Sequence, residues 1–419
     1  MAESIKILMP IFNRATYARV RSFIDLCGSE KPDGLRDTVE LTVALGSSLT
    51  QTEYGNAAED IAAQHPGVKF YLFTDRPSEL SRVLGTTSSV FSDISYLISN
   101  EKFHAGLVVA DRFETLPAAM AFAYEGIPLI HLQGGEVTGN IDEKVRHAVT
   151  KLSDYHFVCT PQSKKYVIAM GEESNRVFFT GCPSLDIIKQ WGIRRNTPKE
   201  RYIMCFFHPD TENLPVQIEQ TQAVLGAVID YCMKYGAKCY WYWPNADRGR
   251  EKVLEVIEGA HKKYSGFLVK AINLPPREFL KQLSGARVVL GNSSVGLREC
   301  SYLGIPAVNV GDRQSIRERS QNVVDIQHDY VNDAEILKAL EAQTLAKRYK
   351  VSYLYGGGDA CHNMLAHIKR FAWIKKGPLT YPYNWEYKSG HFDRERHHRH
   401  SYRFTGRRTK GKVAGGSRV

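Results

Sequence analysis

The 419-residue sequence contains no uninterrupted apolar run near the roughly 20 residues that a membrane-spanning helix requires, and the apolar core of its start, MAESIKILMPIF, is too short for a secretory signal. It also lacks any CxxC pair, and its eight cysteines lie mainly inside apolar runs, as reduced core residues do. No phosphate loop ending in Gly-Lys-Ser/Thr and no GxGxxG is present. These absences predict a cytoplasmic protein that requires neither a metal ion nor a nicotinamide cofactor.

The net charge of +10 lies mostly at one end of the chain. Residues 391–419 hold nine Lys or Arg against two acidic residues, a net +7, so +3 remains for the rest. Charge confined to a tail does not predict a nucleic-acid or membrane partner for the body, and the partner of the tail stays open.

The tail has few aliphatic residues, which predicts disorder. Its histidine-rich run at 397–400 is better explained as solvated charge than as a metal site, because no acid or cysteine completes a ligand set.

Short apolar runs alternate with segments of helical length along the rest of the chain, which predicts an α/β protein with parallel sheets. The predicted strands are 5–12, 40–45, 68–74, 106–110, 127–130, 156–159, 176–180, 202–207, 238–243, 287–290 and 307–310. A polar stretch at 189–200 has the composition of a linker. We therefore expect an N-terminal Rossmann-like domain at 1–188, a second at 189–376, and the tail at 377–419.

One predicted crossover organises the first half. A strand at 106–110, a helix at 116–124 and a strand at 127–130 place the residues after both strands at one edge of the sheet. Charged and titratable residues gather there and just beyond: Asp111, Arg112, His131, Glu136, Asp142, Arg146 and His147. Neighbouring arginines and burial can set the pKa of each carboxylate, so the cluster suits acid/base chemistry.

The second half offers anion-binding groups at its predicted strand ends. In the run GNSSVGLRE, residues 291–299, small residues permit close approach of backbone, and the hydroxyls of Ser293 and Ser294 can hold a phosphate. His208 and Arg313 each follow a strand and can reach the same anion. Arg14, at a predicted helix start in the first half, marks another anion site.

These motifs resemble the hydrolysing UDP-N-acetylglucosamine 2-epimerases of sialic-acid biosynthesis, including the epimerase half of the animal bifunctional enzyme, over about residues 5–375. The matching stretches are NRATY (13–17), ADRFETL (110–116), HLQGGEVTGNIDEKVRHAVTKLSDYH (131–156), GCPSLD (181–186), HPDT (208–211), PNAD (244–247), GNSSVGLRE (291–299) and GDRQSIRERSQNV (311–323). The basic tail lies outside the resemblance.

The resemblance implies a GT-B fold with the nucleotide sugar between two Rossmann-like domains, and a homodimer or homotetramer. It implies that UDP-GlcNAc and water give N-acetylmannosamine and UDP without a cofactor, by anti elimination to 2-acetamidoglucal and hydration with inversion at C2. The implied catalytic positions are Asp111, His131, Gln133, Glu136, Asp142, Arg146, His147 and His156. The implied substrate- and nucleotide-binding positions are Arg14, Arg112, His208, Asn245, Leu274, Ser293, Ser294, Glu299 and Arg313.

Position 133 departs from the family, because many relatives have Glu where this chain has Gln133. An amide cannot transfer a proton as a carboxyl does, so any acid/base role there must move to Glu136 or Asp111, or be absent.

Three classes of function stay open at this point: the hydrolysing epimerase, a GT-B glycosyltransferase, and a non-catalytic binder of a nucleotide sugar or, through the tail, of nucleic acid. Within the first class the sugar can be GlcNAc or a 2,4-diacetamido sugar, and the nucleotide UDP or GDP.

Overall fold

The computed structural model describes residues 4–29, 39–51, 57–73, 82–138, 141–197, 200–209, 214–244, 249–271, 274–314, 316–346 and 349–371. Asn245 and the whole basic tail lie outside these ranges, so their predicted roles stay predictions. None of the helices within the described part of the chain combines the length and apolar character needed to span a bilayer.

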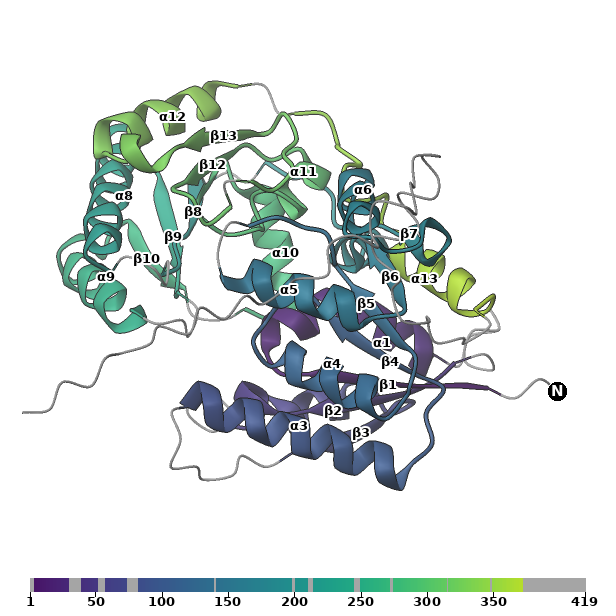
Figure 1. Ribbon diagram of the computed structural model, residues 1–419. Coiled ribbons are helices and arrows are strands. Elements are labelled where there is room, and N and C mark those ends of the chain that lie inside the picture. Colours follow the sequence, from purple (N-terminus) through teal and green to yellow (C-terminus); the bar gives the residue numbers. More distant parts are fainter. Residues whose placement is uncertain are drawn as a thin grey trace, which may run out of the picture. The chain divides into compact units, whose positions relative to one another are not determined.

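The first half of the chain forms a parallel seven-stranded sheet in the order β3-β2-β1-β4-β5-β6-β7 (Figure 1). Its elements are β1 (Ile5–Ile11), α1 (Arg14–Gly28), β2 (Val39–Leu45), α2 (Ala58–Ala63), β3 (Lys69–Leu72), α3 (Arg82–Asn100), β4 (Ala105–Val109), α4 (Thr115–Tyr124), β5 (Leu129–Leu132), α5 (Ile141–Leu152), β6 (Tyr155–Val158), α6 (Pro161–Ala169), β7 (Val177–Phe179) and α7 (Asp186–Gln190).

The second half forms a parallel six-stranded sheet in the order β10-β9-β8-β11-β12-β13. Its elements are β8 (Tyr202–Phe206), α8 (Leu214–Tyr235), β9 (Lys238–Tyr242), α9 (Arg250–Tyr264), β10 (Leu268–Ala271), α10 (Pro276–Gly285), β11 (Val289–Gly291), α11 (Glu299–Leu303), β12 (Ala307–Val310), β13 (Val323–Ile326), α12 (Asp333–Leu345) and α13 (Ala360–Ile368). In both sheets the chain starts in the middle, runs to one edge and then builds the other side, which is the doubly wound arrangement that the sequence predicted.

Helices cover both faces of the first sheet because its strands are apolar on both sides. Ile7, Met9 and Ile11 of β1 pack in a core with α1, whereas Leu8 and Phe12 pack in a separate core with α3 and α4. Continuous burial of successive residues is the signature of a strand that is buried on both faces.

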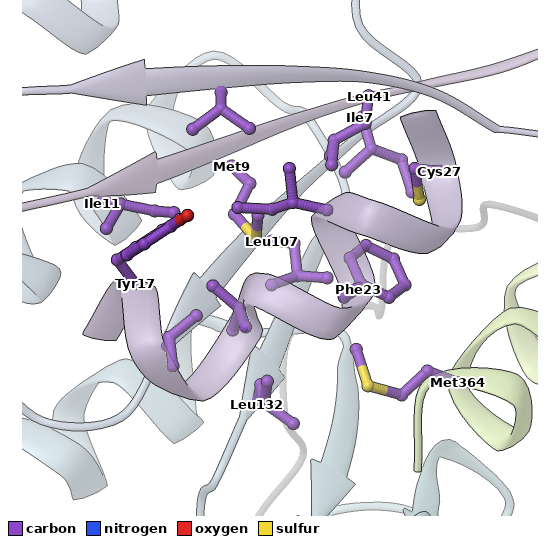
Figure 2. Packing of buried hydrophobic residues seen from close by; sticks show 14 of the residues in the cluster. Ile7, Met9, Ile11, Tyr17, Phe23, Cys27, Leu41, Leu107, Leu132 and Met364 are labelled. Carbon is purple, nitrogen blue, oxygen red and sulfur yellow. The ribbon is translucent and has the colours of Figure 1, made fainter. Parts of the chain in front are cut away.

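The last helix, α13, packs in the core of the first sheet although it follows the second sheet in the chain. Met364 lies in the same apolar cluster as Phe23 of α1 and Leu132 of β5 (Figure 2). The sequence prediction placed residues 189–376 in the second domain and did not anticipate this contact. The predicted domain boundaries themselves stay predictions.

The strand β5 begins two residues later than the sequence predicted. Residues 129–132 pair with 106–109 of β4, and Pro128, which has no N–H to donate, lies just before the pairing begins. His131 is therefore a buried residue of the strand rather than part of the loop that follows it.

Candidate functional site

The strands β4 and β5 are adjacent and parallel, so the residues that follow them lie at one edge of the sheet, as predicted. At each of these two strand ends a residue other than glycine has a left-handed backbone: Ala110 has φ 59° and Gln133 has φ 70°. Such conformations cost on the order of 1–2 kcal/mol each and concentrate at functional sites. They redirect the chain just before the carboxylates: Asp111 follows Ala110 directly, and Glu136 follows Gln133 after two glycines.

Asp111 is buried and held by arginines. Its carboxylate accepts hydrogen bonds from Nε of Arg146, at 2.9 Å, and from Nη2 of the same side chain, and Nη2 of Arg317 lies 4.0 Å away. Burial alone would raise the pKa of Asp111, but the charges of Arg146, Arg317 and Arg19 outweigh it and hold the pKa well below its usual range. Asp111 is therefore an ionised carboxylate at neutral pH.

Glu136 joins residues from the two sheets. Its Oε1 accepts a hydrogen bond from Nη2 of Arg298 at 2.6 Å, and its Oε2 lies 3.2 Å from Nε of Arg317. Burial opposes ionisation here too, yet the charges of Arg298 and Arg317 keep the pKa of Glu136 below its usual value. We call Asp111, Glu136, Arg146, Arg298 and Arg317 the arginine–carboxylate cluster.

The pKa of Asp142 shifts in the opposite direction. It lies at the start of α5 and is partly buried near Asp111, Arg112 and Arg313. Burial, and then the like charge of Asp111, raise the pKa of Asp142 above its usual value despite the nearby arginines. Asp111 and Glu136 are thus held ionised, whereas the pKa of the neighbouring Asp142 is raised.

The histidines at 131 and 156 are fully buried. Nε2 of His131 donates to the carbonyl of Ala110 at 2.9 Å, and its Nδ1, 3.1 Å from the Thr150 hydroxyl, is left to accept. Burial lowers the pKa of His131 to about 3, so it is neutral. It therefore fixes the backbone immediately before Asp111.

His156 and His147 have different surroundings. Nε2 of His156 lies 3.2 Å from Oε2 of Glu172, whose Oε1 also accepts from Lys151 at 2.7 Å. His147 is half-buried on α5, and burial lowers its pKa. Of the three histidines predicted to be catalytic, His147 is the only one that the described structure leaves partly exposed.

Gln133 is fully oriented by two partners. Its Oε1 accepts from Nη1 of Arg19 at 3.3 Å, so its amide nitrogen faces Sγ of Cys182, to which it donates at 3.4 Å. The side chain is buried. The amide at this position accepts from a cation with its oxygen and donates to a sulfur atom with its nitrogen, whereas an ionised carboxylate could only accept.

The strand ends of the second sheet are built from backbone and amides. Asn292, after β11, accepts from the backbone N–H of His208 and donates to its carbonyl, both at 2.8 Å. Nη1 of Arg313 donates to the carbonyl of Asn292 at 3.3 Å. Burial, and then the charge of Arg313, lower the pKa of His208 to about 3. A neutral imidazole and a guanidinium therefore meet at this edge.

The remaining predicted binding residues are spread more widely. Ser293 and Ser294 follow Asn292 and are partly buried, and the Ser294 carbonyl accepts from the backbone N–H of Arg298 at 2.9 Å. Burial raises the pKa of Glu299 against the charge of Arg298. The other predicted positions lie at the surface or partly so: Arg14 at the start of α1, Arg112 with its Nε 3.4 Å from Glu114, and Leu274 just before α10.

The sequence interpretation missed Arg19, Arg298 and Arg317 as site residues. Arg298 is 2% exposed, and a buried guanidinium requires an anionic partner. Both Arg298 and Arg317 lie in motifs quoted for the resemblance, in GNSSVGLRE and GDRQSIRERSQNV. The apolar neighbours of Arg298, Val295 and Leu297, were the available signal that this arginine is internal.

A comparison with protein families matches residues 38–369 to the family described as UDP-N-acetylglucosamine 2-epimerase. The match includes the arginine–carboxylate cluster and the ends of β4, β5, β8 and β11. This chain belongs to that family. The prediction that it is an enzyme of the hydrolysing 2-epimerase type is thereby confirmed at the level of the family.

Individual relatives of the family support the same assignment. The chain is 30% identical over 348 residues to the hydrolysing UDP-N,N'-diacetylbacillosamine 2-epimerase of Legionella pneumophila, covering 79% of this chain and 89% of that protein. It is 26% identical over 353 residues to the UDP-N-acetylglucosamine 2-epimerase of Neisseria meningitidis, covering 81% and 88%. The S. aureus protein MnaA, solved with UDP, shares the fold with a TM-score of 0.70 at 18% identity, over 89% of this chain and 99% of that one.

Proposed function

We propose that this epimerase hydrolyses UDP-N-acetylglucosamine to N-acetylmannosamine and UDP, and so supplies the sugar for a sialic-acid or related nonulosonic-acid route. The observation that carries the proposal is that the pKa values of three neighbouring carboxyl groups shift in different directions. Asp111 and Glu136 are held ionised, whereas the pKa of Asp142 is raised. A reaction that removes a proton and later returns one is served by carboxyl groups that differ in how readily they give up a proton.

The first step is removal of the C2 proton of the sugar with departure of UDP from C1. The proton goes to an ionised carboxylate, Asp111 or Glu136, and the C2 electron pair forms the C1–C2 double bond of 2-acetamidoglucal. UDP leaves with the electrons of the C1–O bond. In the second step water adds across the double bond. Its oxygen joins C1 and the proton that it loses passes to a carboxylate, while a carboxylic acid delivers a proton to C2 from the opposite face, which inverts that carbon.

Departure of a diphosphate requires cations and N–H donors where the charge develops. Arg313, the turn at Ser293 and Ser294, and the neutral His208 supply these groups at the end of the second sheet. The proposed division assigns proton transfer to the first sheet and nucleotide departure to the second.

A second substrate is favoured by one specific observation. The Legionella pneumophila relative acts, by its name, on UDP-N,N'-diacetylbacillosamine, and it matches this chain at higher identity than the Neisseria meningitidis protein does. The same elimination and hydration apply to a 2,4-diacetamido sugar, because only C1 and C2 react. The proposal for the second substrate is therefore the same chemistry with a different group at C4.

The test is an NMR assay in heavy water with three donors offered separately: UDP-GlcNAc, UDP-N,N'-diacetylbacillosamine and GDP-N,N'-diacetylbacillosamine. Each incubation contains no acceptor. We expect UDP and free N-acetylmannosamine from the first donor, with solvent deuterium at C2. Turnover of a diacetamido donor alone would move the assignment to the second substrate. A product that keeps its original hydrogen at C2 would refute the elimination, and a requirement for an acceptor would indicate a glycosyltransferase.

A further inference from the structure

Two cysteines lie beside the site and are not used by the proposed reaction. Cys159 directly follows β6, and Cys182 lies shortly beyond β7, and these two strands are neighbours in the first sheet. Both side chains are buried in one apolar cluster, and the Cys159 thiol is in hydrogen-bond contact with Sγ of Cys182. The two sulfur atoms are therefore close enough to interact directly.

Several groups around Cys182 stabilise negative charge on its sulfur, although burial and the negative charge of Glu299 oppose it. Gln133 Nε2 donates to Sγ at 3.4 Å, and the Ser184 hydroxyl lies 3.2 Å from it. The positive charge of Arg298 acts on the same atom. The contact from Cys159, and then the charge of Arg298, lower the pKa of Cys182 to about 7 against the effect of burial. Because the pKa of Cys159 is raised instead, Cys182 is the thiol of the pair that more readily forms the thiolate, which is the reactive form.

Two cysteines of the second sheet lack this arrangement. Cys205 and Cys239 lie in the core of the second sheet, where burial raises the pKa of both thiols well above the usual value. They are thus inert thiols at similar depth, and the difference from Cys182 comes from the surrounding donors rather than from burial.

We infer that Cys182 is an oxidation site for hydrogen peroxide and that Cys159 is its resolving thiol, so that the pair closes a reversible disulfide beside the arginine–carboxylate cluster. In the first step the Cys182 sulfur attacks one peroxide oxygen, the O–O bond breaks, hydroxide leaves, and Cys182 becomes a sulfenic acid. In the second step the Cys159 sulfur attacks the Cys182 sulfur, the S–O bond breaks, and the hydroxyl leaves as water with the Cys159 proton. The two sulfurs lose two electrons, and these reduce the peroxide.

Oxidation removes the contact that orients Gln133. A disulfide sulfur carries no negative charge and is a weak acceptor, so the Gln133 amide loses a charge-assisted hydrogen bond at the strand end that leads to Glu136. The loss of one such bond predicts a fall in activity of about ten-fold. The burial of both sulfurs predicts that the reaction is slow, since peroxide must enter a closed core.

The experiment treats the full-length protein with hydrogen peroxide, blocks free thiols, and maps non-reduced peptides by mass spectrometry. In the wild type we expect a disulfide joining Cys159 to Cys182, activity about ten-fold lower, and recovery after dithiothreitol. In Cys159→Ala the sulfenic acid has no partner, so Cys182 should gain a second oxygen as sulfinic acid, and dithiothreitol should not restore activity. Cys239→Ala is the matched control and should behave as the wild type.

Peptide masses report the chemistry independently of turnover, so the inference is tested even if the substrate has been misassigned. If Cys159→Ala does not fold, Cys159→Ser replaces it, and the wild-type map stands without any variant. The inference is overturned if Cys182 stays reduced while other cysteines oxidise, if the disulfide joins a different pair, or if the Cys159 variant recovers with dithiothreitol as fully as the wild type.

Discussion

The two sheets have residues with positive φ at corresponding strand ends, but the residue types at these positions differ. β4 and β5 occupy the places in the first sheet that β11 and β12 occupy in the second. At the end of each of these four strands stands a residue with positive φ: Ala110 at 59° and Gln133 at 70° in the first sheet, Gly291 at 128° and Gly311 at 75° in the second. The first sheet therefore carries strain at its strand ends, whereas the second uses glycine.

The different residue types follow from the space around each of these positions. A Cβ at Gly291 would lie 2.0 Å from the carbonyl oxygen of Phe206, so backbone passes where a side chain would be. At Ala110 and Gln133 the side chains fit, and hydrogen bonds from His131 and Arg19 hold the strained turns. The comparison teaches that Gly291 is needed where the backbone of the adjacent strand leaves no room for a Cβ, whereas Ala110 and Gln133 keep side chains at the first edge.

The strongest test of this division removes a proton-transfer group from the first edge. Asp111→Asn and Glu136→Gln keep the shape but lose the base, so kcat should fall by about 10²–10⁴ while the Kd for UDP stays within a few-fold. Steady-state kinetics and calorimetric titration with UDP measure the two quantities. The control is Glu101→Gln, which removes a carboxylate paired with Lys69 on the same sheet away from the site and should leave kcat unchanged. Near wild-type turnover in both site variants would refute the assignment.

The next largest effect concerns the glycine edge. Gly291→Ala introduces both the clash and an unfavourable φ, so the free energy of unfolding should fall by roughly 3–5 kcal/mol in urea denaturation. Gly259→Ala is the matched control, because a Cβ there meets nothing within 4 Å and the position is inside α9. That control should gain about 0.5–1 kcal/mol. Equal behaviour of the two variants would show that close packing at β11 is not a constraint.

A cation at the second edge should affect binding rather than chemistry. Arg313→Ala should weaken UDP binding by roughly 1.5–3 kcal/mol, as expected for one charge-assisted contact. Calorimetric titration with UDP measures this change, and Lys338→Ala, at an exposed position on α12, controls for the loss of one positive charge. An unchanged Kd for UDP in Arg313→Ala would remove this residue from the nucleotide site.

The smallest effect is expected when glycine, the residue type used at the strand ends of the second sheet, replaces Ala110 in the first. Ala110→Gly relieves the left-handed strain but frees the unfolded chain, so the free energy of unfolding should change by no more than about 1 kcal/mol in either direction. Because Asp111 then follows a looser turn, kcat should fall a few-fold at constant Kd for UDP. A loss of stability well beyond this range would mean that Ala110 contributes packing rather than strain.

The sequence was sufficient to predict the parts of the fold that have strong local patterns. The apolar runs at 106–110 and 307–310 became buried strands β4 and β12 within a residue of their predicted ends. β10 and β13 were missed because they are only four residues long, and a charged residue, Lys270 or Asp325, interrupts the apolar run of each.

The site was harder to predict where it depends on pairing between distant residues. Asp111 and Glu136 were found because they follow strands joined by one crossover, whereas Arg298 reaches Glu136 across 162 residues of sequence. Local pattern carries no information about such a partner. The opposite pKa shifts of Asp111 and Asp142 also depend on which arginines lie in contact, and spacing along the chain does not determine that.

The placement of α13 has a consequence for how the protein is made. Asp186, at the start of α7, accepts hydrogen bonds from the backbone N–H groups of Ala360, at 2.9 Å, and Cys361, at 2.7 Å, and so caps the helix that completes the first core. During synthesis on the ribosome, Met364 can pack against Phe23 only after the whole second sheet has been made. The core of the first sheet therefore stays incomplete until then. Contacts this distant in sequence slow folding and leave apolar surface open to chaperones and to aggregation meanwhile. Nascent chains released before residue 360 should therefore be degraded or aggregate rather than accumulate as a folded first half.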